Sequence, residues 1–475
     1  MIYLLFGAGC WFTFRTRICA VSLHPPVWQS LKNSIHPQPG GLTSFQSLCT
    51  SLAARVGSGN LAGVALAITA GVPGAVFWMW VAAFIGMATS FAECSLAQLY
   101  KERDANGQFR GGPAWYMARG LGMRWMGVLF AVFLLIAYAI IFSGVQANAV
   151  ARALSFSFDF PPLVTGIILA VFAMLAITRG LHGVARLMQG FVPLMAIIWV
   201  LTCLVICVMN IGQLPHVIWS IFESAFGWQE AAGGAAGYTL SQAITNGFQR
   251  SMFSNEGGWG DANAAAAAAS WPPHPAAQGI VQMIGIFIDT LVICTASAML
   301  ILLAGNGHNL HAAGRYSAYP EGDAGANGFL GCGVCYPRGY SVCLQLHRCQ
   351  LHLCRKQSFF LRLNNPKAIW CLRICTFATV IGGTSRGFPL MWQLADIIMA
   401  CMAITNLTAI LLLSPVVHTI ASDYLRQRKL GVRPVFDPLR YPRSVASFLQ
   451  TRGMMFRRSN HNYRSTHSLF LLKSA

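Results

Sequence analysis

The chain has 475 residues, of which 55% are hydrophobic and only 10% are charged. Soluble globular domains carry about a quarter charged residues, so this composition excludes an ordinary soluble protein and indicates a membrane protein. The formal charge of +19 does not predict nucleic-acid binding, because Lys and Arg collect in the cytoplasmic loops of membrane proteins.

Apolar segments of roughly membrane length follow one another along the chain. They span 1–14, 51–71, 73–99, 125–153, 163–178, 187–211, 239–269, 279–304, 367–384 and 390–418. A further span would fit between 305 and 367, but residues 308–356 mix Gly, Cys, His and Arg without a long apolar run.

The distribution of basic residues predicts the orientation. Lys and Arg follow the first, third, fifth and last segments, whereas loops 154–162 and 212–238 contain none. The positive-inside rule therefore places the N-terminus in the periplasm and the C-terminus in the cytoplasm of a bacterial inner membrane. This alternation requires one more helix between 305 and 355, which the residues there do not supply.

The second and seventh segments differ from the rest because glycine and polar residues interrupt them. The interruptions read Gly57-Ser58-Gly59-Asn60 and Phe253-Ser254-Asn255-Glu256. Each opens a block of five segments, and an odd number of spans makes the two blocks insert with opposite orientations. Broken helices at matching positions of two halves indicate the binding site of an inverted-repeat transporter.

The first interruption offers ligands for both an anion and a cation. The half-helix that follows it presents its N-terminal N–H groups to a carboxylate. Carbonyl groups freed between Ala53 and Val56 suit a small cation, and Ser58 and Asn60 add side-chain donors and acceptors. The alternative is a close-packed interface of small residues between helices, which glycine also serves.

In combination, these motifs resemble the sodium:alanine symporter family. The resemblance rests on Gly57 to Val64, Pro73 to Trp80, Gly111-Gly112-Pro113, Phe253 to Glu256 and Asn406, and it covers roughly residues 40–305 and 357–442. It implies an all-α membrane protein of about eleven transmembrane helices. Ten of these would form a leucine-transporter-type five-plus-five inverted repeat with two broken helices.

The resemblance also implies a site for a small neutral amino acid and sodium. The substrate would contact Ser58, Gly59, Asn60, Gln146, Phe253 and Ser254. Sodium would contact Ala53, Val56 and Asn60, and the broken-helix loops would contain Gly57, Gly63, Asn255 and Glu256. No other metal or cofactor is expected. From the residues alone, Gln146 could equally make an interhelical hydrogen bond, and Phe253 could be an ordinary core residue.

Four carboxylates lie within apolar segments, where ionisable groups are costly and functional by default. They are Glu93, Glu256, Asp289 and Asp396. Glu256 lies beside a helix break, so we expect it to organise the loop. The sequence assigns no role to Asp289 or Asp396.

Some stretches depart from the family pattern, although the sequence on both sides of each stretch matches that pattern in register. They are 16–30, 257–261, 308–356, 385–388 and 443–475. Abrupt loss and recovery of the pattern indicates local reading-frame errors. The rival interpretation of 308–356 is a zinc module around Cys332 and Cys335, although only one CxxC pair is present.

The predicted organisation has four parts: an N-terminal helix and loop (1–50), two inverted repeats (51–211 and 239–420) and a basic cytoplasmic tail (421–475). The predicted function is sodium symport of alanine or glycine by alternating access, with the amino acid and the lipid bilayer as partners, no nucleic acid, and a plausible monomer. A proton-coupled transporter, a channel and an intramembrane enzyme are the alternatives. No nucleophile–base set supports an enzyme, and two nonidentical breaks suit alternating access better than a channel filter.

Overall fold

The computed structural model describes most of the helical part of the chain. It covers residues 1–16, 42–103, 109–177, 181–226, 236–260, 269, 273–304, 360–361, 366–385 and 388–437. Residues 308–356, with Cys332 and Cys335, and residues 443–475 lie outside this part, as do 17–30 and 386–387. The reading-frame and zinc interpretations of those residues therefore stay predictions.

The described residues are almost entirely helical. In the first half the helices are α1 (Ile2–Thr16), α4 (Ser44–Arg55), η1 (Ser58–Asn60), α5 (Ala62–Gly71), α6 (Ala75–Leu99), α7 (Pro113–Gly120), α8 (Arg124–Ile136), η2 (Ala137–Phe142), α9 (Ser143–Phe158), α10 (Pro162–Ile177), α11 (Leu181–Met209) and α12 (Leu214–Ala225). In the second half they are α13 (Ala236–Asn255), α15 (Pro275–Ile286), η4 (Phe287–Cys294), α16 (Thr295–Ala304), α19 (Pro366–Ser385), α20 (Phe388–Leu412) and α21 (Ser414–Lys429). Two short strands, β1 (Glu102–Arg103) and β2 (Phe109–Arg110), pair antiparallel between α6 and α7.

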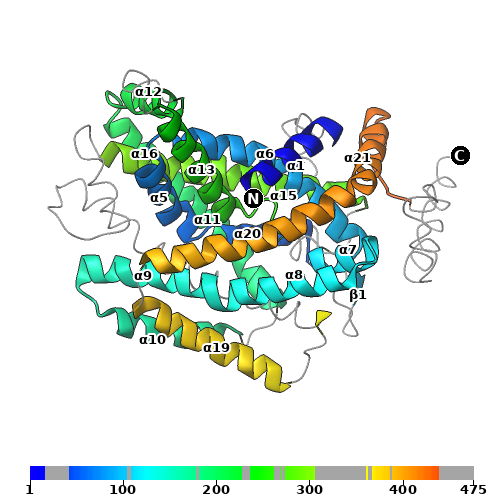
Figure 1. The fold of residues 1–475 in the computed structure, drawn as a ribbon, viewed down its shortest axis with the longest axis horizontal. Helices are drawn as coiled ribbons and strands as arrows, with labels where there is room; N and C mark the ends of the chain where they lie inside the picture. Colours follow the sequence, from blue (N-terminus) through cyan, green and yellow to red (C-terminus); the bar gives the residue numbers. More distant parts are fainter. Residues whose placement is uncertain are drawn as a thin grey trace, which may run out of the picture.

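The long helices lie in layers (Figure 1). The continuous rod α8–η2–α9 lies against α20 on one side and against α10 and α19 on the other. A second group, built from α4, α5, α6, α13 and α15, packs together around the two interrupted helices. Within the described part of the chain, five helices are long and apolar enough to cross a membrane, or six when α4 and α5 count as one bent span.

One predicted segment is wrong in extent. Residues 390–418 were expected as a single apolar span, but α20 ends at Leu412 and α21 begins at Ser414. Pro415 lies in the first turn of α21, where its missing N–H costs nothing, whereas inside a continuous helix it would remove a hydrogen bond. The chain therefore starts a new helix at this proline.

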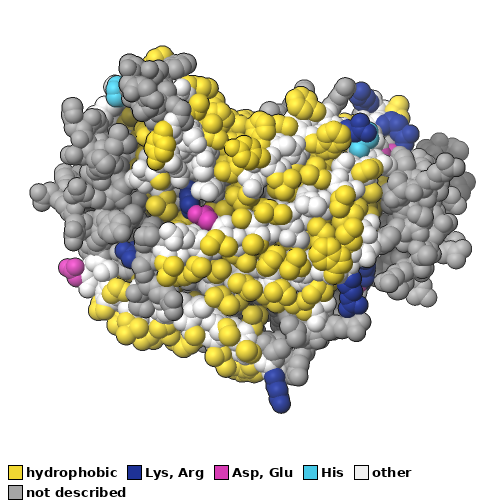
Figure 2. Space-filling model, in the orientation of Figure 1, with side chains coloured by type: hydrophobic (Ala, Val, Ile, Leu, Met, Phe, Trp, Pro, Cys, Tyr) yellow, Lys and Arg dark blue, Asp and Glu magenta, His cyan; other side chains and the backbone are white. Residues whose placement is uncertain are grey.

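The surface is that of a lipid-facing protein. Hydrophobic side chains cover the face formed by α8, α9 and α20, while Lys and Arg gather at the end where α7 and α21 lie (Figure 2). On α11, Leu194, Ile197, Leu201 and Leu204 are each more than half exposed. Large contiguous apolar surface of this kind is rare on soluble proteins and suits contact with lipid tails.

Both predicted helix breaks are present. The axis bends by 62° between α4 and the helix that follows Ser58. The second helix, α13, ends at Asn255, and the chain then turns through Glu256 with a φ of 55° and through Gly258 and Gly260 with φ of 97° each. Glycine adopts this left-handed region without strain. A Cβ at Gly258 would also lie 2.8 Å from Cδ1 of Leu5, so a larger residue would have to displace that side chain as well.

The segment before α15 is held to α21 by a buried histidine. His274 caps α15 by accepting from the backbone N–H of Ala276 at its Nδ1, and its Nε2 lies 3.3 Å from a carboxylate oxygen of Asp423. Because Nδ1 accepts, Nε2 carries the proton and donates to Asp423. Phe436 donates its backbone N–H to the carbonyl of Pro273, which closes the same contact.

We expect this contact to weaken in acid. Burial lowers the pKa of His274 to about 4, although Asp423 opposes the shift. Below a pH of about 6.5, His274 is protonated in the unfolded chain but stays neutral in the folded chain. The free energy of unfolding therefore falls by up to about 3 kcal/mol as the pH approaches 4. The check is the melting temperature in detergent at pH 7 and 4.5. His274→Asn keeps a capping acceptor and should flatten this dependence, so equal slopes in both proteins would contradict the prediction.

Candidate functional site

The two helix breaks touch each other. A Cβ placed on Gly59 would lie 2.9 Å from the ring of Phe253 and 3.2 Å from the Cα of Ser254. The first break therefore packs directly on the last turn of α13, and the two breaks face one another. The absence of a side chain at Gly59 is what allows this approach.

Asp289 joins the two breaks. Asn60 donates from Nδ2 to Oδ1 of Asp289 at 2.7 Å, and Ser254 donates from Oγ to Oδ2 at 2.7 Å. The other end of the Asn60 amide, Oδ1, accepts from the backbone N–H of Gly57 at 3.0 Å. Cys294 lies between the same two side chains, with its Sγ 3.3 Å from the Asn60 amide. Sequence reasoning noticed Asp289 as an acid in an apolar segment but could not place it at the breaks.

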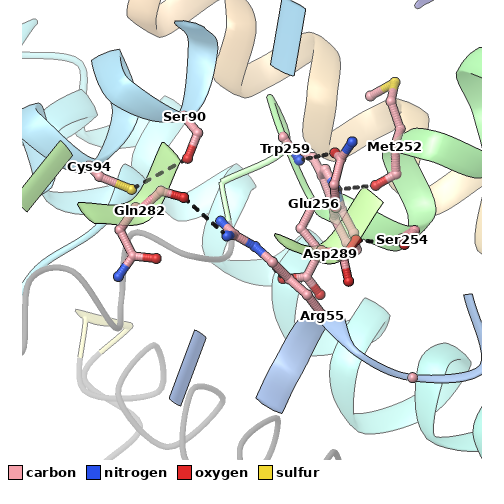
Figure 3. A network of polar contacts seen from close by, with 12 residues as sticks. Arg55, Ser90, Cys94, Met252, Ser254, Glu256, Trp259, Gln282 and Asp289 are labelled. Atoms are coloured by element: carbon pink, nitrogen blue, oxygen red, sulfur yellow. Dashed lines mark hydrogen bonds and ion pairs between the residues drawn. The ribbon is translucent and has the colours of Figure 1, made fainter. Parts of the chain in front are cut away.

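A buried ion pair also connects the two breaks (Figure 3). Arg55, the last residue of α4, points its Nε toward Oε2 of Glu256 at 4.0 Å, and its Nη1 donates to the carbonyl of Gln282 at 3.4 Å. Glu256 also accepts from the hydroxyl of Tyr138 at 3.3 Å. Glu256 thus lies in the second break, as predicted, whereas no local pattern distinguishes Arg55 from other basic residues at helix ends.

Side chains of the second break hold its turn in shape. Asn255 accepts from the backbone N–H of Gly257 at 2.8 Å and donates to Oγ of Ser251 at 3.0 Å. Trp259 folds back and donates its Nε1 hydrogen to the carbonyl of Met252 at 2.9 Å. The predicted loop residue Asn255 therefore supports the backbone rather than pointing away from it.

Asn406 connects the same turn to Glu93 on a second spanning helix. Asn406 on α20 donates to Glu93 on α6 and to the carbonyl of Gly258, the latter at 3.0 Å. The hydroxyl of Tyr116 donates to the Asn406 oxygen. Asn406, one of the residues on which the family resemblance rests, therefore lies behind the second break.

Gln146 reaches the first break from α9. Its Oε1 accepts from the backbone N–H of Ser58 at 3.1 Å. This is the interhelical hydrogen bond that the sequence left open. Ala53 lies in the last turn of α4 and Val56 directly follows that helix, both buried beside the break. The substrate role of Gln146 and the cation roles of Ala53 and Val56 stay predictions.

An aromatic and charged stack covers Phe253. The ring of Trp392 lies 4.6 Å from the ring of Phe253, and the guanidinium of Arg250 lies 5.0 Å above Trp392. Arg250 pairs with Asp396 at 2.6 Å, and a Cβ placed on Gly63 would lie 3.6 Å from the far edge of Trp392. Sequence reasoning missed Trp392 and Arg250, because nothing in their local pattern distinguishes them from core and loop residues.

The described residues hold no group of three or more His, Cys, Asp and Glu side chains that could bind a metal ion. The polar groups at the junction of the two breaks are mainly oxygen ligands. They come from carboxylates, hydroxyls, amides and the backbone of two interrupted helices. Interrupted helices packed together inside an apolar helical bundle define a membrane transporter. The chain matches the sodium:alanine symporter family over residues 1–438 and belongs to that family.

The chain matches known relatives over almost its whole length. It is 83% identical to the Escherichia coli transporter YaaJ over 449 residues, which is 93% of each protein. It is 40% identical to the probable sodium/glutamine symporter GlnT of Bacillus subtilis, over 92% of this chain and 90% of GlnT. It is 37% identical to the sodium/alanine symporter AgcS of Methanococcus maripaludis, over 90% of this chain and 95% of AgcS.

Among solved structures, the chain resembles a mutant manganese transporter from Eremococcus coleocola with a TM-score of 0.50. The two share 12% of their residues, over 79% of this chain and 78% of the other. At this identity the likeness shows a common membrane-transporter fold only.

Proposed function

We propose that this protein is a secondary active symporter that carries alanine or glycine together with sodium across the inner membrane by alternating access. The observation that supports it most is the junction of the two broken helices, where Asn60, Asp289 and Ser254 meet. Within the sodium:alanine symporter family, such a junction is where a small zwitterion and a cation can bind side by side.

The shape of the junction favours a small substrate. Phe253 packs on Gly59, and Trp392 covers Phe253 from the other side. We expect these two large rings to leave room above the first break for a small side chain only. We therefore propose that the substrate is alanine or glycine, and not the glutamine in the name of the Bacillus relative. Ser58 to Asn60 and Gln146 would surround this substrate.

The wider architecture is part of the same proposal. Residues 51–211 and 239–420 would form the two halves of a five-plus-five inverted repeat, with about eleven transmembrane helices in all. The basic end at α7 and α21 would face the cytoplasm, followed by the tail from 421 onward, and the N-terminus would be periplasmic.

Uptake of radiolabelled alanine into proteoliposomes with the purified chain tests this function. An inward sodium gradient should drive accumulation above equilibrium, and unlabelled glycine should compete while glutamine should not. Accumulation driven by a proton gradient without sodium would instead support the proton-coupled alternative. Downhill flux that no gradient can concentrate would support a channel.

A further inference from the structure

We propose that Asp289 binds the co-transported cation directly, in a site completed by the hydroxyl oxygens of Ser254 and Thr290. This inference rests on the proposed symport and names the residue that links it to the ion. All three side chains are fully buried. The Ser254 Oγ lies 2.7 Å and the Thr290 Oγ1 3.3 Å from the same carboxylate oxygen, Oδ2. Hard cations prefer such clusters of oxygen ligands.

The charges around Asp289 favour a bound monovalent cation. Arg55 and Glu256 form a pair with each other at 4.0 Å. Asp289 receives hydrogen bonds from neutral groups on Asn60, Ser254 and Thr290, and Arg55 acts on it only at longer range. Within the described ranges, no basic side chain lies at ion-pair distance from Asp289. The three ionised groups together carry one net negative charge, and a buried charge in a membrane is costly unless a counter-ion neutralises it.

A cation at Asp289 would act on both halves of the substrate site. One carboxylate oxygen holds Asn60 of the first break, and the other holds Ser254 of the second break. The neighbouring residues Gly59 and Phe253 are the ones that touch across the junction. An ion that fixes Asp289 therefore fixes the relative position of the two breaks, which gives sodium and substrate a shared free energy of binding.

A buried polar stripe leads from this site along the interface of α4 and α15. Gln278, Gln282 and Asp289 recur on one face of their helix, and both glutamines donate to Ser47 across the interface, at 3.1 and 3.4 Å. The side-chain oxygens of Ser51, Gln278 and Gln282 are buried without a hydrogen-bond partner. Buried oxygens are almost always bonded, so this stripe is suited to a passing cation, toward the end of α4 where Ser44 begins the helix.

The test measures sodium itself as the probe, with the purified full chain. Binding of radioactive sodium is followed by scintillation proximity, and the sodium dependence of alanine uptake is measured in parallel. Asp289→Asn keeps the size and one acceptor oxygen but removes the charge and replaces the other oxygen with an NH2 group, so we expect at least about tenfold weaker sodium affinity in both assays. The matched control is Glu223→Gln, which neutralises a partly exposed carboxylate on α12 and should leave sodium affinity unchanged.

The outcomes separate this inference from the proposed function. If the unsubstituted chain neither binds sodium nor couples it to uptake, both proposals fall. If it does both and Asp289→Asn binds sodium equally well, only the assignment of Asp289 falls. If Asp289→Asn does not purify as a folded protein, the sodium affinities of Ser254→Ala and Thr290→Val test the cation site instead. Each removes one oxygen ligand, and unchanged sodium affinity in both would overturn the site.

Discussion

Replacing Asn60 with leucine should weaken sodium-driven alanine uptake by roughly ten- to a hundredfold, while the protein still inserts into the membrane. The Asn60 amide bonds in two directions, to the N–H of Gly57 and to the carboxylate of Asp289. Leucine has a similar volume but leaves both groups unbonded inside the protein. Losing a hydrogen bond to a charged group costs about 1.5–3 kcal/mol, which corresponds to that range of affinity.

The measurement for Asn60→Leu is uptake as a function of sodium and of alanine concentration, with the amount of inserted protein determined in the same vesicles. Asn210→Leu is the matched control. The Asn210 amide donates only to the carbonyl of Ile206 at the end of its own helix, at 2.9 Å. If Asn60→Leu behaved like this control, residues 57–60 would be a packing motif and not part of the binding site.

Replacing Gly59 with alanine should also suppress transport strongly, for a steric reason. The added Cβ would lie 2.9 Å from the ring of Phe253 and 3.2 Å from the Cα of Ser254, and the second of these is backbone that cannot swing away. The backbone at Gly59 is not left-handed, so alanine introduces no conformational strain of its own. Overpacking of this kind costs about 1–3 kcal/mol, and here it pushes apart the two breaks that form the site.

We therefore expect sodium-driven uptake by Gly59→Ala to fall by about tenfold or more, with insertion retained. Gly7→Ala on α1 is the control, because a Cβ there meets no atom within 4 Å. Purified Gly59→Ala should also bind alanine more weakly by equilibrium dialysis. Normal uptake and binding would show that the junction opens enough to accept a methyl group, and the steric argument would be wrong.

Several features of the fold could be predicted from the sequence because a bilayer imposes them locally. An apolar run must be helical to satisfy its backbone in lipid, so helices such as α6 and α10 follow from composition alone. Glycine and polar residues within such a run are unfavourable for a straight helix, which is why the breaks at Gly57 and after Asn255 could be predicted. The division at Leu413 was missed, although Pro415 was the available signal.

The positions of Asn60 and Ser254 at a shared junction could be expected, because family motifs mark both and the predicted repeat would relate them. The tertiary structure alone decided which other groups reach that junction. Asp289 comes from a helix whose local pattern is simply apolar, and Arg55 ends a helix as many basic residues do. Their importance depends on contacts with residues as far as 229 positions away in the chain. Local sequence determines helices and breaks because those follow from backbone hydrogen bonds and the bilayer, whereas the pairing of buried charges depends on how the helices pack.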